Sequence, residues 1–487
     1  ARFTKLVVEA IRKAVGPFFP ISLRFSADEL LEDGNTLEDT IEVISYFAEE
    51  VDILNVSAAL NDNLQYQIDK MNLPDGWRAY MAKAVKERFP DKTIVTSGNI
   101  RSPKRAAEIL ESGEADLLAM GRGLIAEPNW VNKVANGQEA LLRKCISCNI
   151  GCADHRIAKA RPIRCTVNPD LHYEDAYKMK PVLHPTKMVV IGGGTAGLEA
   201  ACTAAEVGVS VELFEQKDYL GGLGHEIARF PDKKRIDDFI TYQVNRTKEL
   251  DNLNVHLNQA ATLEDVAKFK PDIIVNATGA KPLLPPIKGL KEQLANEKRN
   301  VFSIFDILGD MSKFQEFEGK EVAVIGGGAV GLDVVEYYAE RGAKKVSIVE
   351  MQGELGKDLD LITKLAMMEI VEEYGVEVHV ETKLTEVKEN SFLVEKDGEL
   401  LEIPFDLGFV CLGMRAEAPL IRELDQYARE NEAVLLNIGD SKVARRIMEG
   451  TREARDILKT IEVLENTRTQ KQLFEQSKML QKATQTI

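Results

Sequence analysis

The sequence predicts an α/β protein, and three observations support that class. Apolar strand-like segments alternate with helical segments over residues 20–123, which is the pattern of parallel βα units. Two strand–turn–helix–strand frames with glycine triplets begin near residues 186 and 320. Between these parts, four of the six cysteines fall within residues 145–165. We therefore expect a repeated βα region, a cysteine-rich segment and two dinucleotide-binding domains.

Composition narrows the partners and the compartment. The 487 residues suggest about three domains of roughly 150 residues each. The net charge of −16 argues against a nucleic-acid partner, because phosphates require a basic surface. No run approaches the ~18 apolar residues of a membrane span, so we expect no membrane partner. Cysteines that are rare overall but dense locally favour metal binding in a reducing compartment, and we expect a cytoplasmic protein.

The first region consists of four strand–helix pairs. The apolar runs that predict strands are 20–26, 51–57, 93–100 and 115–123. The segments with helical spacing are 4–15, 35–50, 74–89 and 102–113. Each strand ends in small or polar residues, and functional groups of βα barrels cluster at such strand ends. The loop 61–77 is expected to overlie the active site.

The ends of the last two strands form a candidate phosphate site. Gly98 and Asn99 follow one strand, and Gly121 and Arg122 follow the next. Loops at these places in βα barrels commonly hold phosphate, and a guanidinium can add a bidentate contact. Arg24 stands inside an apolar strand, where an unpaired charge is costly to bury. A reduced flavin ring is one anionic partner for Arg24, and a barrel carboxylate is the alternative.

The cysteine segment predicts a metal centre. Its spacing is C-x2-C-x3-C-x12-C, formed by Cys145, Cys148, Cys152 and Cys165. Thiolates are soft ligands that suit an iron–sulfur cluster or zinc. Zinc sites usually show two separated pairs of cysteines, so three close cysteines and a later fourth favour a 4Fe–4S cluster. Zinc and reduced structural cysteines remain the alternatives, and the other two cysteines are expected in the core.

Each glycine triplet predicts a dinucleotide site. In the first frame Gly192, Gly194 and Gly197 open a helix, and Glu215 ends the next strand. The glycines let backbone amides approach a pyrophosphate, and the carboxylate accepts hydrogen bonds from ribose hydroxyls. The second frame repeats this pattern with Gly326, Gly328, Gly331 and Glu350. A carboxylate at 350 would repel a 2′-phosphate, which favours NADH over NADPH.

Two such frames in one chain suggest a bound flavin and a visiting nicotinamide. We expect FAD in the first frame and NADH in the second. The segments 275–282 and 409–416 each end a buried strand in small residues, as at a crossover beside a dinucleotide. Asp440 ends the segment 435–440, where it could hold a ribityl hydroxyl or form only a turn.

The predicted domains follow from these motifs. They are a partial βα barrel, a cluster segment with linker, an FAD-binding domain in two pieces, an NADH-binding domain and a C-terminal helix or tail, at 1–140, 141–185, 186–300 with 400–460, 301–399 and 461–487.

The order of these parts resembles the large NADH:flavin oxidoreductases with an Old Yellow Enzyme-type barrel. That group includes 2-enoate reductases, 2,4-dienoyl-CoA reductase and trimethylamine dehydrogenase. The motifs SLRFS, TSGNI, GRGLIAEPNW, DYLGG, NATGAKP and NIGD carry the resemblance together with the cysteine run and both glycine frames. It extends from about residue 20 to residue 458.

The resemblance implies three bound cofactors and a visiting NADH. It places FMN with Arg24, Gly98, Asn99, Gly121 and Arg122, and a 4Fe–4S cluster on the four cysteines. It places FAD with Gly192, Gly194, Gly197, Glu215, Gly279 and Asp440. It places NADH with Gly326, Gly328, Gly331 and Glu350.

Barrels of this family have eight strands, and the sequence predicts only the last four. The resemblance places the catalytic residues in the other half, so they are unknown for this chain. We expect the rest of the barrel from the same longer polypeptide or, as the alternative, from a second subunit. We also expect a homo-oligomer.

The resemblance implies NADH-dependent reduction of an activated C=C bond in a small molecule such as a 2-enoate, an enoyl-CoA or an enone. Electrons would pass through FAD, the 4Fe–4S cluster and FMN. One alternative is an amine dehydrogenase of the trimethylamine type. The other is an electron-transfer subunit that passes electrons from NADH to a partner.

Overall fold

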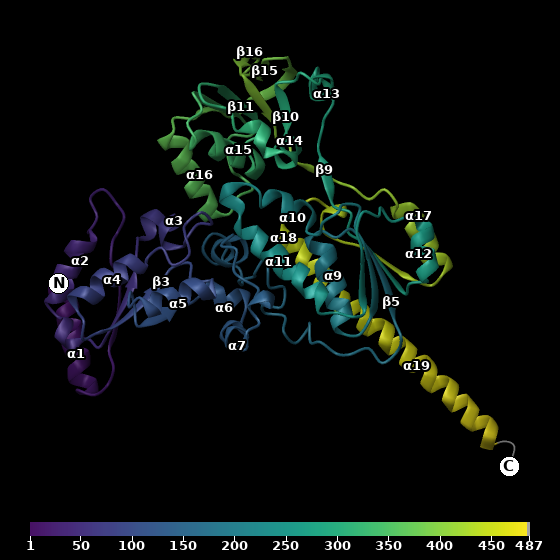
Figure 1. Cartoon of the computed structure of the whole chain (residues 1–487), viewed down its shortest axis with the longest axis horizontal. Helices are drawn as coiled ribbons and strands as arrows, with labels where there is room; N and C mark the ends of the chain where they lie inside the picture. The colour runs from purple at the N-terminus through teal and green to yellow at the C-terminus, as the bar shows by residue number, and fades with distance from the viewer. Residues whose placement is uncertain (485–487) are drawn as a thin grey trace. The chain divides into compact units, whose positions relative to one another are not determined.

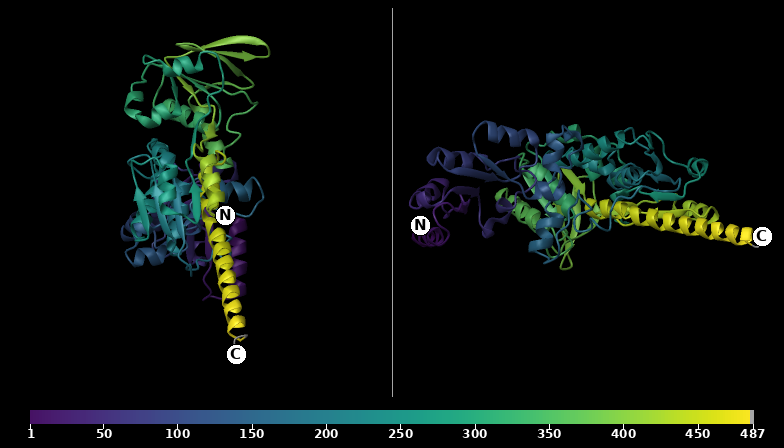
Figure 2. Two further views of the ribbon diagram at one scale, coloured as in Figure 1. Left: turned by 90° about the vertical axis from the view of Figure 1, so that its right-hand side faces the viewer. Right: turned by 90° about the horizontal axis from the view of Figure 1, so that it is seen from below.

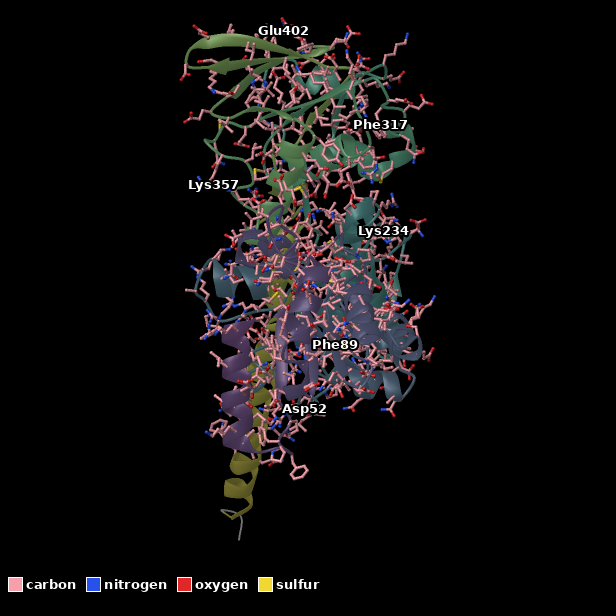
Figure 3. The ribbon with its side chains drawn as sticks, turned by 90° about the vertical axis from the view of Figure 1, so that its left-hand side faces the viewer. Asp52, Phe89, Lys234, Phe317, Lys357 and Glu402 are labelled. Atoms are coloured by element: carbon pink, nitrogen blue, oxygen red, sulfur yellow. The ribbon has the colours of Figure 1, made fainter. Side chains whose placement is uncertain are left out.

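The structure, a computed structural model, describes residues 1–484, and the chain forms two compact units (Figure 1). The first unit consists of Ala1–Ile163 and Asp358–Glu373, and the second consists of Arg164–Lys357 and Tyr374–Ile487. Lys357, labelled in Figure 3, is the last residue before the chain passes to the first unit for one helix. The predicted C-terminal segment 461–487 thus includes three residues, 485–487, outside the described part.

The first unit contains a parallel sheet in the order β1-β2-β3-β4, as the sequence predicts. The strands are β1 Ser22–Ser26, β2 Ile53–Ser57, β3 Thr93–Ser97 and β4 Leu117–Ala119. Leu54, Val56 and Ile94 are fully buried against the helices, so apolar burial holds this layer together. The other face is partly open: Leu117 is 50% exposed and Arg24 is also exposed.

Eight helices of at least four residues accompany this sheet. They are α1 Arg2–Val15, α2 Leu37–Ser45, α3 Leu64–Gln67, α4 Ala79–Arg88, α5 Pro103–Glu111, α6 Arg122–Ala126, α7 Trp130–Ala135 and α16 Leu361–Glu373. Helix α4 begins later than the predicted segment 74–89 because Gly76 turns the chain with φ of 63°. The strand predicted at 115–123 ends at Ala119, and Arg122 instead opens α6.

A hydrogen-bonded carboxylate closes the N-terminal end of this sheet. Asp52, labelled in Figure 3, precedes β2 and accepts from the Ile21 N–H at 2.8 Å and from Arg12 of α1 at 2.6 Å. At the other end of the sheet, α16 forms hydrogen bonds with the cysteine loop, residues 145–154, and with α3. Its first N–H, from Leu361, donates to Asp154 at 3.2 Å, and Glu369 accepts from the Tyr66 hydroxyl at 2.9 Å.

The second unit contains two five-stranded parallel sheets with equivalent strand orders, β19-β8-β5-β6-β7 and β10-β17-β11-β12-β13. The strands of the first sheet are β5 Lys187–Ile191, β6 Ser210–Phe214, β7 Leu253–His256, β8 Ile273–Asn276 and β19 Val434–Asn437. The strands of the second are β10 Val301–Ser303, β11 Glu321–Ile325, β12 Lys345–Val349, β13 Glu377–His379 and β17 Leu407–Val410. Each glycine triplet follows the middle strand, as the repeated frame predicts.

Helices cover both sheets. Around the first sheet they are α9 Thr195–Glu206, α10 Gly222–Ile227, α11 Arg235–Lys248, α12 Leu263–Phe269, α17 Ile421–Glu430 and α18 Ile447–Arg455. Around the second they are α13 Leu290–Ala295, α14 Ile304–Gly309 and α15 Ala329–Ala339. The cysteines outside the cysteine segment, Cys202 on α9 and Cys411 after β17, are buried, as predicted for core residues.

Two antiparallel elements complete the second unit. Strands β9 Ala280–Pro282 and β18 Met414–Ala416 pair at the two crossovers between the sheets, which the sequence places at 275–282 and 409–416. Strands β14 Lys383–Val387, β15 Ser391–Lys396 and β16 Glu399–Pro404 form a small sheet that carries Glu402, labelled in Figure 3.

The chain ends in helix α19, Ile457–Thr484. Its first turns pack on the core of the first five-stranded sheet through Ile457 and Ile461, and it then runs on as a long helix (Figure 2). Among the described residues, no helix is long and apolar enough to cross a membrane.

Candidate functional site

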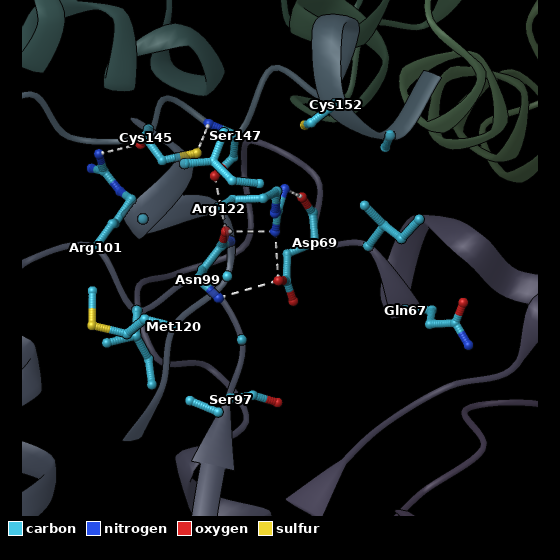
Figure 4. A pocket seen from close by; sticks show the side chains of 18 of the residues that line it. Gln67, Asp69, Ser97, Asn99, Arg101, Met120, Arg122, Cys145, Ser147 and Cys152 are labelled. Atoms are coloured by element: carbon cyan, nitrogen blue, oxygen red, sulfur yellow. Dashed lines mark hydrogen bonds and ion pairs between the residues drawn. The ribbon is translucent and has the colours of Figure 1, made fainter. Parts of the chain in front are cut away.

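The first unit has a cavity of about 560 Å³ beside the C-terminal ends of its strands (Figure 4). The residues predicted to hold FMN all line this cavity, namely Arg24, Gly98, Asn99, Gly121 and Arg122. Cys145 and Cys152 of the predicted metal centre line it as well. The structure therefore brings the predicted flavin residues together with two of the four cysteines.

Backbone conformation at the strand ends shapes the cavity. Gly98 has φ of 112° and Asn99 has φ of 47°, so the chain turns directly after β3. A Cβ at Gly98 would lie 2.9 Å from Cδ of Arg78, so glycine makes room for that side chain. A Cβ at Gly121 would meet nothing within 4 Å. A ligand can therefore approach the backbone closely at Gly121, which fits a bound phosphate.

Arg24 differs from the expectation of a buried strand arginine. It is exposed, and its guanidinium donates to the Ser57 hydroxyl at 3.2 Å. The reason is that the four-stranded sheet leaves its inner face open, so this arginine keeps contact with solvent. Folding leaves this guanidinium in contact with water, so the folded chain bears no desolvation cost for its charge. The guanidinium can still contact an anionic ring in the cavity.

The buried carboxylate of Asp69 organises the cavity wall, and sequence reasoning missed it. Its oxygens accept from Trp77 Nε1 at 2.6 Å, from the Asn99 N–H at 3.1 Å and from the guanidiniums of Arg78 at 3.0 Å and Arg122 at 2.6 Å. Asp69 lies in the loop 61–77, which has no periodicity or motif to identify it. Its role depends on contacts with residues that are distant in the chain.

Arg78 supplies a buried charge that points to a ligand. Its side chain is almost fully buried, and it donates to the carbonyls of Tyr66 and Gln67 at 2.5 and 2.9 Å. Its Nε has no hydrogen-bond partner among the described residues. Burial lowers the pKa of Arg78 below its ordinary value although Asp69 opposes the shift. An unsatisfied donor beside this cavity fits an anionic or oxygen-rich group such as FMN.

Protein groups hold the side chain of Arg122. It donates to Asp69 and to Asn149 of the cysteine loop, each at 2.6 Å. Burial works against its charge, but Cys145 and Asp69 raise the pKa of Arg122 above its ordinary value. The bidentate phosphate contact that the sequence suggests for Arg122 would compete with these bonds, so that role stays a prediction.

The cysteine loop has the features of a ligand loop. Ser147 and Asn149 take left-handed conformations with φ of 52° and 57°, which coil the chain around Cys148. The Ser147 N–H donates to Cys145 Sγ at 3.3 Å. Burial and the neighbouring Cys145 raise the pKa of the Cys152 thiol above its ordinary value. A bound metal would have the opposite effect on this pKa, because it stabilises the thiolate.

None of the described cysteines forms a disulfide, so the thiols remain available as ligands. The first three lie in the first unit, and Cys165 belongs to the second unit, whose first residue is Arg164. The three thiols of the first unit are soft donors of the kind that an iron or zinc centre uses. The 4Fe–4S assignment stays a prediction.

The second unit has a cavity of about 700 Å³ at the first glycine triplet. Gly192, Gly194, Glu215 and Gly279 line it, and all four are predicted FAD residues. A Cβ at Gly194 or Gly279 would meet nothing within 4 Å, so both backbones face open space. This open cradle at the start of α9 fits a dinucleotide pyrophosphate.

The other glycines of the triplets serve close packing. A Cβ at Gly197 would lie 1.9 Å from the Gly192 carbonyl oxygen, and one at Gly331 would lie 1.8 Å from the Gly326 carbonyl oxygen. Only glycine lets each helix lie this close to its strand. Gly328 is the residue before α15, as Gly194 is before α9.

The two predicted ribose carboxylates also hold their loops. Glu215 accepts from the Gly193 N–H at 2.7 Å, and Glu350 accepts from the Gly327 N–H at 2.6 Å. Their second oxygens accept the N–H two residues further on, at 2.9 and 2.7 Å. Asp440 follows β19, where it accepts from the Arg445 N–H at 2.9 Å, and burial raises its pKa. Its contact with FAD stays a prediction.

Sequence profiles of two families match the chain. The pyridine nucleotide-disulphide oxidoreductase family matches residues 165–275 and 248–438. The NADH:flavin oxidoreductase / NADH oxidase family matches residues 1–140. Together the two profiles cover both units.

The chain is also similar to curated proteins and to a solved structure. An NADH oxidase of Thermoanaerobacter brockii is 38% identical over 79% of this chain and 58% of its own length. A cinnamate reductase of Clostridium sporogenes is 28% identical over 94% of this chain and 69% of its own length. A solved 2-naphthoyl-CoA reductase complex superposes with a TM-score of 0.82 at 25% identity, over 93% of this chain and 67% of that one. The chain thus spans 58–69% of the length of these proteins.

Proposed function

The chain belongs to the NADH:flavin oxidoreductases with an Old Yellow Enzyme-type barrel region joined to pyridine nucleotide-disulphide oxidoreductase domains, and we propose that it takes part in reducing an activated carbon–carbon double bond. The reaction would consume NADH, a proton and an alkene, and produce NAD⁺ and the saturated product. The cavity of the first unit carries this proposal, because it places Cys145 and Cys152 among the predicted flavin residues.

The substrate class follows from two relatives whose names state their reactions. One reduces cinnamate and the other 2-naphthoyl-CoA. A carboxylate or a thioester withdraws electrons from the bond that is reduced, and we propose a 2-enoate, an enoyl-CoA or an enone as the substrate. Both glycine frames are formed around Glu215 and Glu350, which supports an NADH-consuming direction over amine oxidation.

The residues of this chain would bind and position the cofactors. Gly194 and Gly279 would hold FAD, Glu350 would hold the NADH ribose, and Arg24 with Arg78 would hold FMN. The four cysteines would hold a 4Fe–4S cluster. When bound, these groups supply hydride exchange at the flavins and one-electron transfer at the cluster. The charged and hydrogen-bonded wall around Asp69 would keep the flavin site ordered.

We propose that the remaining barrel strands come from the same longer polypeptide or from a second subunit. Four parallel strands leave β1 and β4 as open edges, which soluble proteins usually cover. Helix α1 also exposes the large apolar side chains Phe3 and Leu6. We propose that the catalytic acid comes from that other part, as the resemblance to the family implies.

Replacement of Cys148 by alanine tests the proposed electron path. We expect a protein with the complete barrel to lose NADH-driven alkene reduction, since one ligand of the cluster is gone, while NADH still bleaches FAD. Stopped-flow absorbance measures the flavin step, and product analysis measures the alkene step. Cys202→Ala is the control, because Cys202 is a buried thiol outside the cysteine segment.

The results separate the two possible failures of this proposal. If Cys148→Ala keeps both steps, the cluster is not on the electron path. If anaerobically purified wild-type protein contains zinc but neither iron nor acid-labile sulfide, the cluster assignment itself is wrong.

A further inference from the structure

An ion pair joins the buried Asp69 of the loop 61–77 to the partly buried Arg122 at the start of α6. Asp69 is 5% exposed, and its Oδ2 lies 2.6 Å from Nη2 of Arg122 (Figure 4). Arg122 Nη1 also donates to the Asp69 backbone carbonyl at 2.9 Å. Two bonds from one guanidinium to one residue fix their relative geometry more firmly than a single contact would.

From this pair, hydrogen bonds lead to a cysteine sulfur. Arg122 Nη2 donates to the side-chain oxygen of Asn99 at 3.3 Å, and the Ser147 hydroxyl donates to the same oxygen at 2.9 Å. The Ser147 N–H in turn donates to Cys145 Sγ at 3.3 Å. Three bonds therefore connect the Arg122 guanidinium with a predicted metal ligand.

A second set of bonds holds the loop further along. Arg122 Nη1 donates to the Asn149 side-chain oxygen at 2.6 Å, and Asn149 Nδ2 donates back to the Asp69 carbonyl at 3.3 Å. Asn149 is one of the two left-handed residues of the loop and is almost fully buried. The pair thus contacts the loop directly after Cys148 and, through Asn99, before it.

The charges of the pair lie where they can affect an iron–sulfur cluster. The reduction potential of such a cluster depends on nearby charge and on hydrogen bonds to its sulfurs. A positive group stabilises the reduced, more negative cluster, and a negative group destabilises it. Burial reduces the screening of these charges by solvent, so the removal of one charge should change the reduction potential of the cluster measurably.

We infer that the Asp69–Arg122 pair is a positioning device for the proposed cluster: it holds residues 145–152 against the flavin cavity and sets the charge that the cluster experiences. This inference rests on the proposed 4Fe–4S site. It assigns Asp69 and Arg122 to electron transfer through other residues, without contact with substrate.

The test compares two neutral variants of the 487-residue chain. The midpoint potential of the cluster is measured by an anaerobic redox titration followed by electron paramagnetic resonance, which requires neither substrate nor FMN. Asp69→Asn should favour the reduced cluster about tenfold, a rise of about 59 mV for one electron, because the guanidinium loses its counter-charge. Arg122→Gln should shift the equilibrium in the opposite direction by a similar factor.

The control is Asp116→Asn. Asp116 also pairs with a cation, Lys86 at 2.8 Å, and accepts a backbone N–H, from Ile94 at 2.8 Å, but it precedes β4 at the opposite end of the sheet. The equilibrium constant for reduction of the cluster in this variant should stay within about twofold of the wild-type value. Arg122→Lys keeps the charge but cannot form the forked contacts, so it should shift the potential less than Arg122→Gln does.

Opposite shifts in the two neutral variants support the inference, since a general loosening of the fold would move both in the same direction. Shifts of equal sign, or none, overturn it. If the neutral variants do not retain iron, the iron content of Asp116→Asn decides: retained iron in that control supports the inference, and iron lost there as well overturns it. Wild-type protein without iron would instead refute the proposed cluster.

Discussion

At the scale of single residues, the carboxylates that end the second strand of each glycine frame have two functions. Glu350 accepts the Gly327 N–H and the Gln352 N–H, and these bonds shape the loop before any nucleotide is bound. The remaining lone pairs can accept a ribose hydroxyl. We therefore propose that the same residue, which orders the loop, also selects the cofactor.

Glu350→Gln should weaken the binding of NADH about tenfold and reduce the preference for NADH over NADPH. The amide keeps one acceptor oxygen for the Gly327 N–H but loses the charge that repels a 2′-phosphate. Dissociation constants from nicotinamide fluorescence check this. Glu377→Gln on β13 of the same sheet is the control, since it pairs with Lys345 away from the triplet. An unchanged ratio of the two affinities would count against the ribose assignment.

At the scale of elements, the glycines of one turn are required for different reasons. Gly194 precedes α9 and faces the open cavity, whereas Gly197 inside α9 touches the Gly192 carbonyl. The first glycine thus leaves space for a ligand, and the second is needed for the packing of helix on strand. A sequence motif shows both as identical letters.

Gly194→Ala and Gly197→Ala should therefore separate binding from folding. Gly194→Ala should leave the thermal unfolding midpoint of the FAD-free protein unchanged. It should weaken the binding of FAD about tenfold or more, because the added methyl group occupies the space beside the glycine backbone. Gly197→Ala should lower that midpoint, at a cost of roughly 1–3 kcal/mol, because its Cβ would overlap a carbonyl oxygen. Calorimetry and flavin fluorescence measure the two effects. Equal loss of stability in both variants would contradict this division.

At the scale of the whole molecule, the sheet of the first unit is more exposed to solvent than the two five-stranded sheets of the second unit. The inner face of the first sheet leaves Arg24 and Leu117 exposed, while the strand β5 of the second unit is almost fully buried. A flavin cavity with one open side excludes water poorly. The two units should thus differ in how well they retain a flavin.

We expect the purified 487-residue chain to contain FAD but little FMN. Addition of the upstream barrel strands, in one polypeptide or as a second subunit, should restore about one FMN per chain by completing the cavity wall. Chromatography of the released flavins after denaturation gives the ratio. Stoichiometric FMN in the 487-residue chain would show that four strands suffice.

Local patterns in the sequence determined much of this protein. Alternating apolar and helical segments predict the four-stranded parallel sheet, and the two glycine frames predict the pair of five-stranded sheets, because both depend on neighbours in the chain. The residues predicted to hold FMN, from Arg24 to Arg122, line one cavity, since the C-terminal ends of parallel strands meet at one edge.

Only the tertiary structure decided how the cavity wall is held and where α16 belongs. Asp69 and Arg78 follow no motif. Asp69 pairs with both Arg78 and Arg122, and the second pair joins residues 53 positions apart. Helix α16 follows β12 in the chain but bonds to α3 of the first unit through Glu369. Such contacts depend on which surfaces meet after folding, and the spacing of residues along the chain does not encode that information.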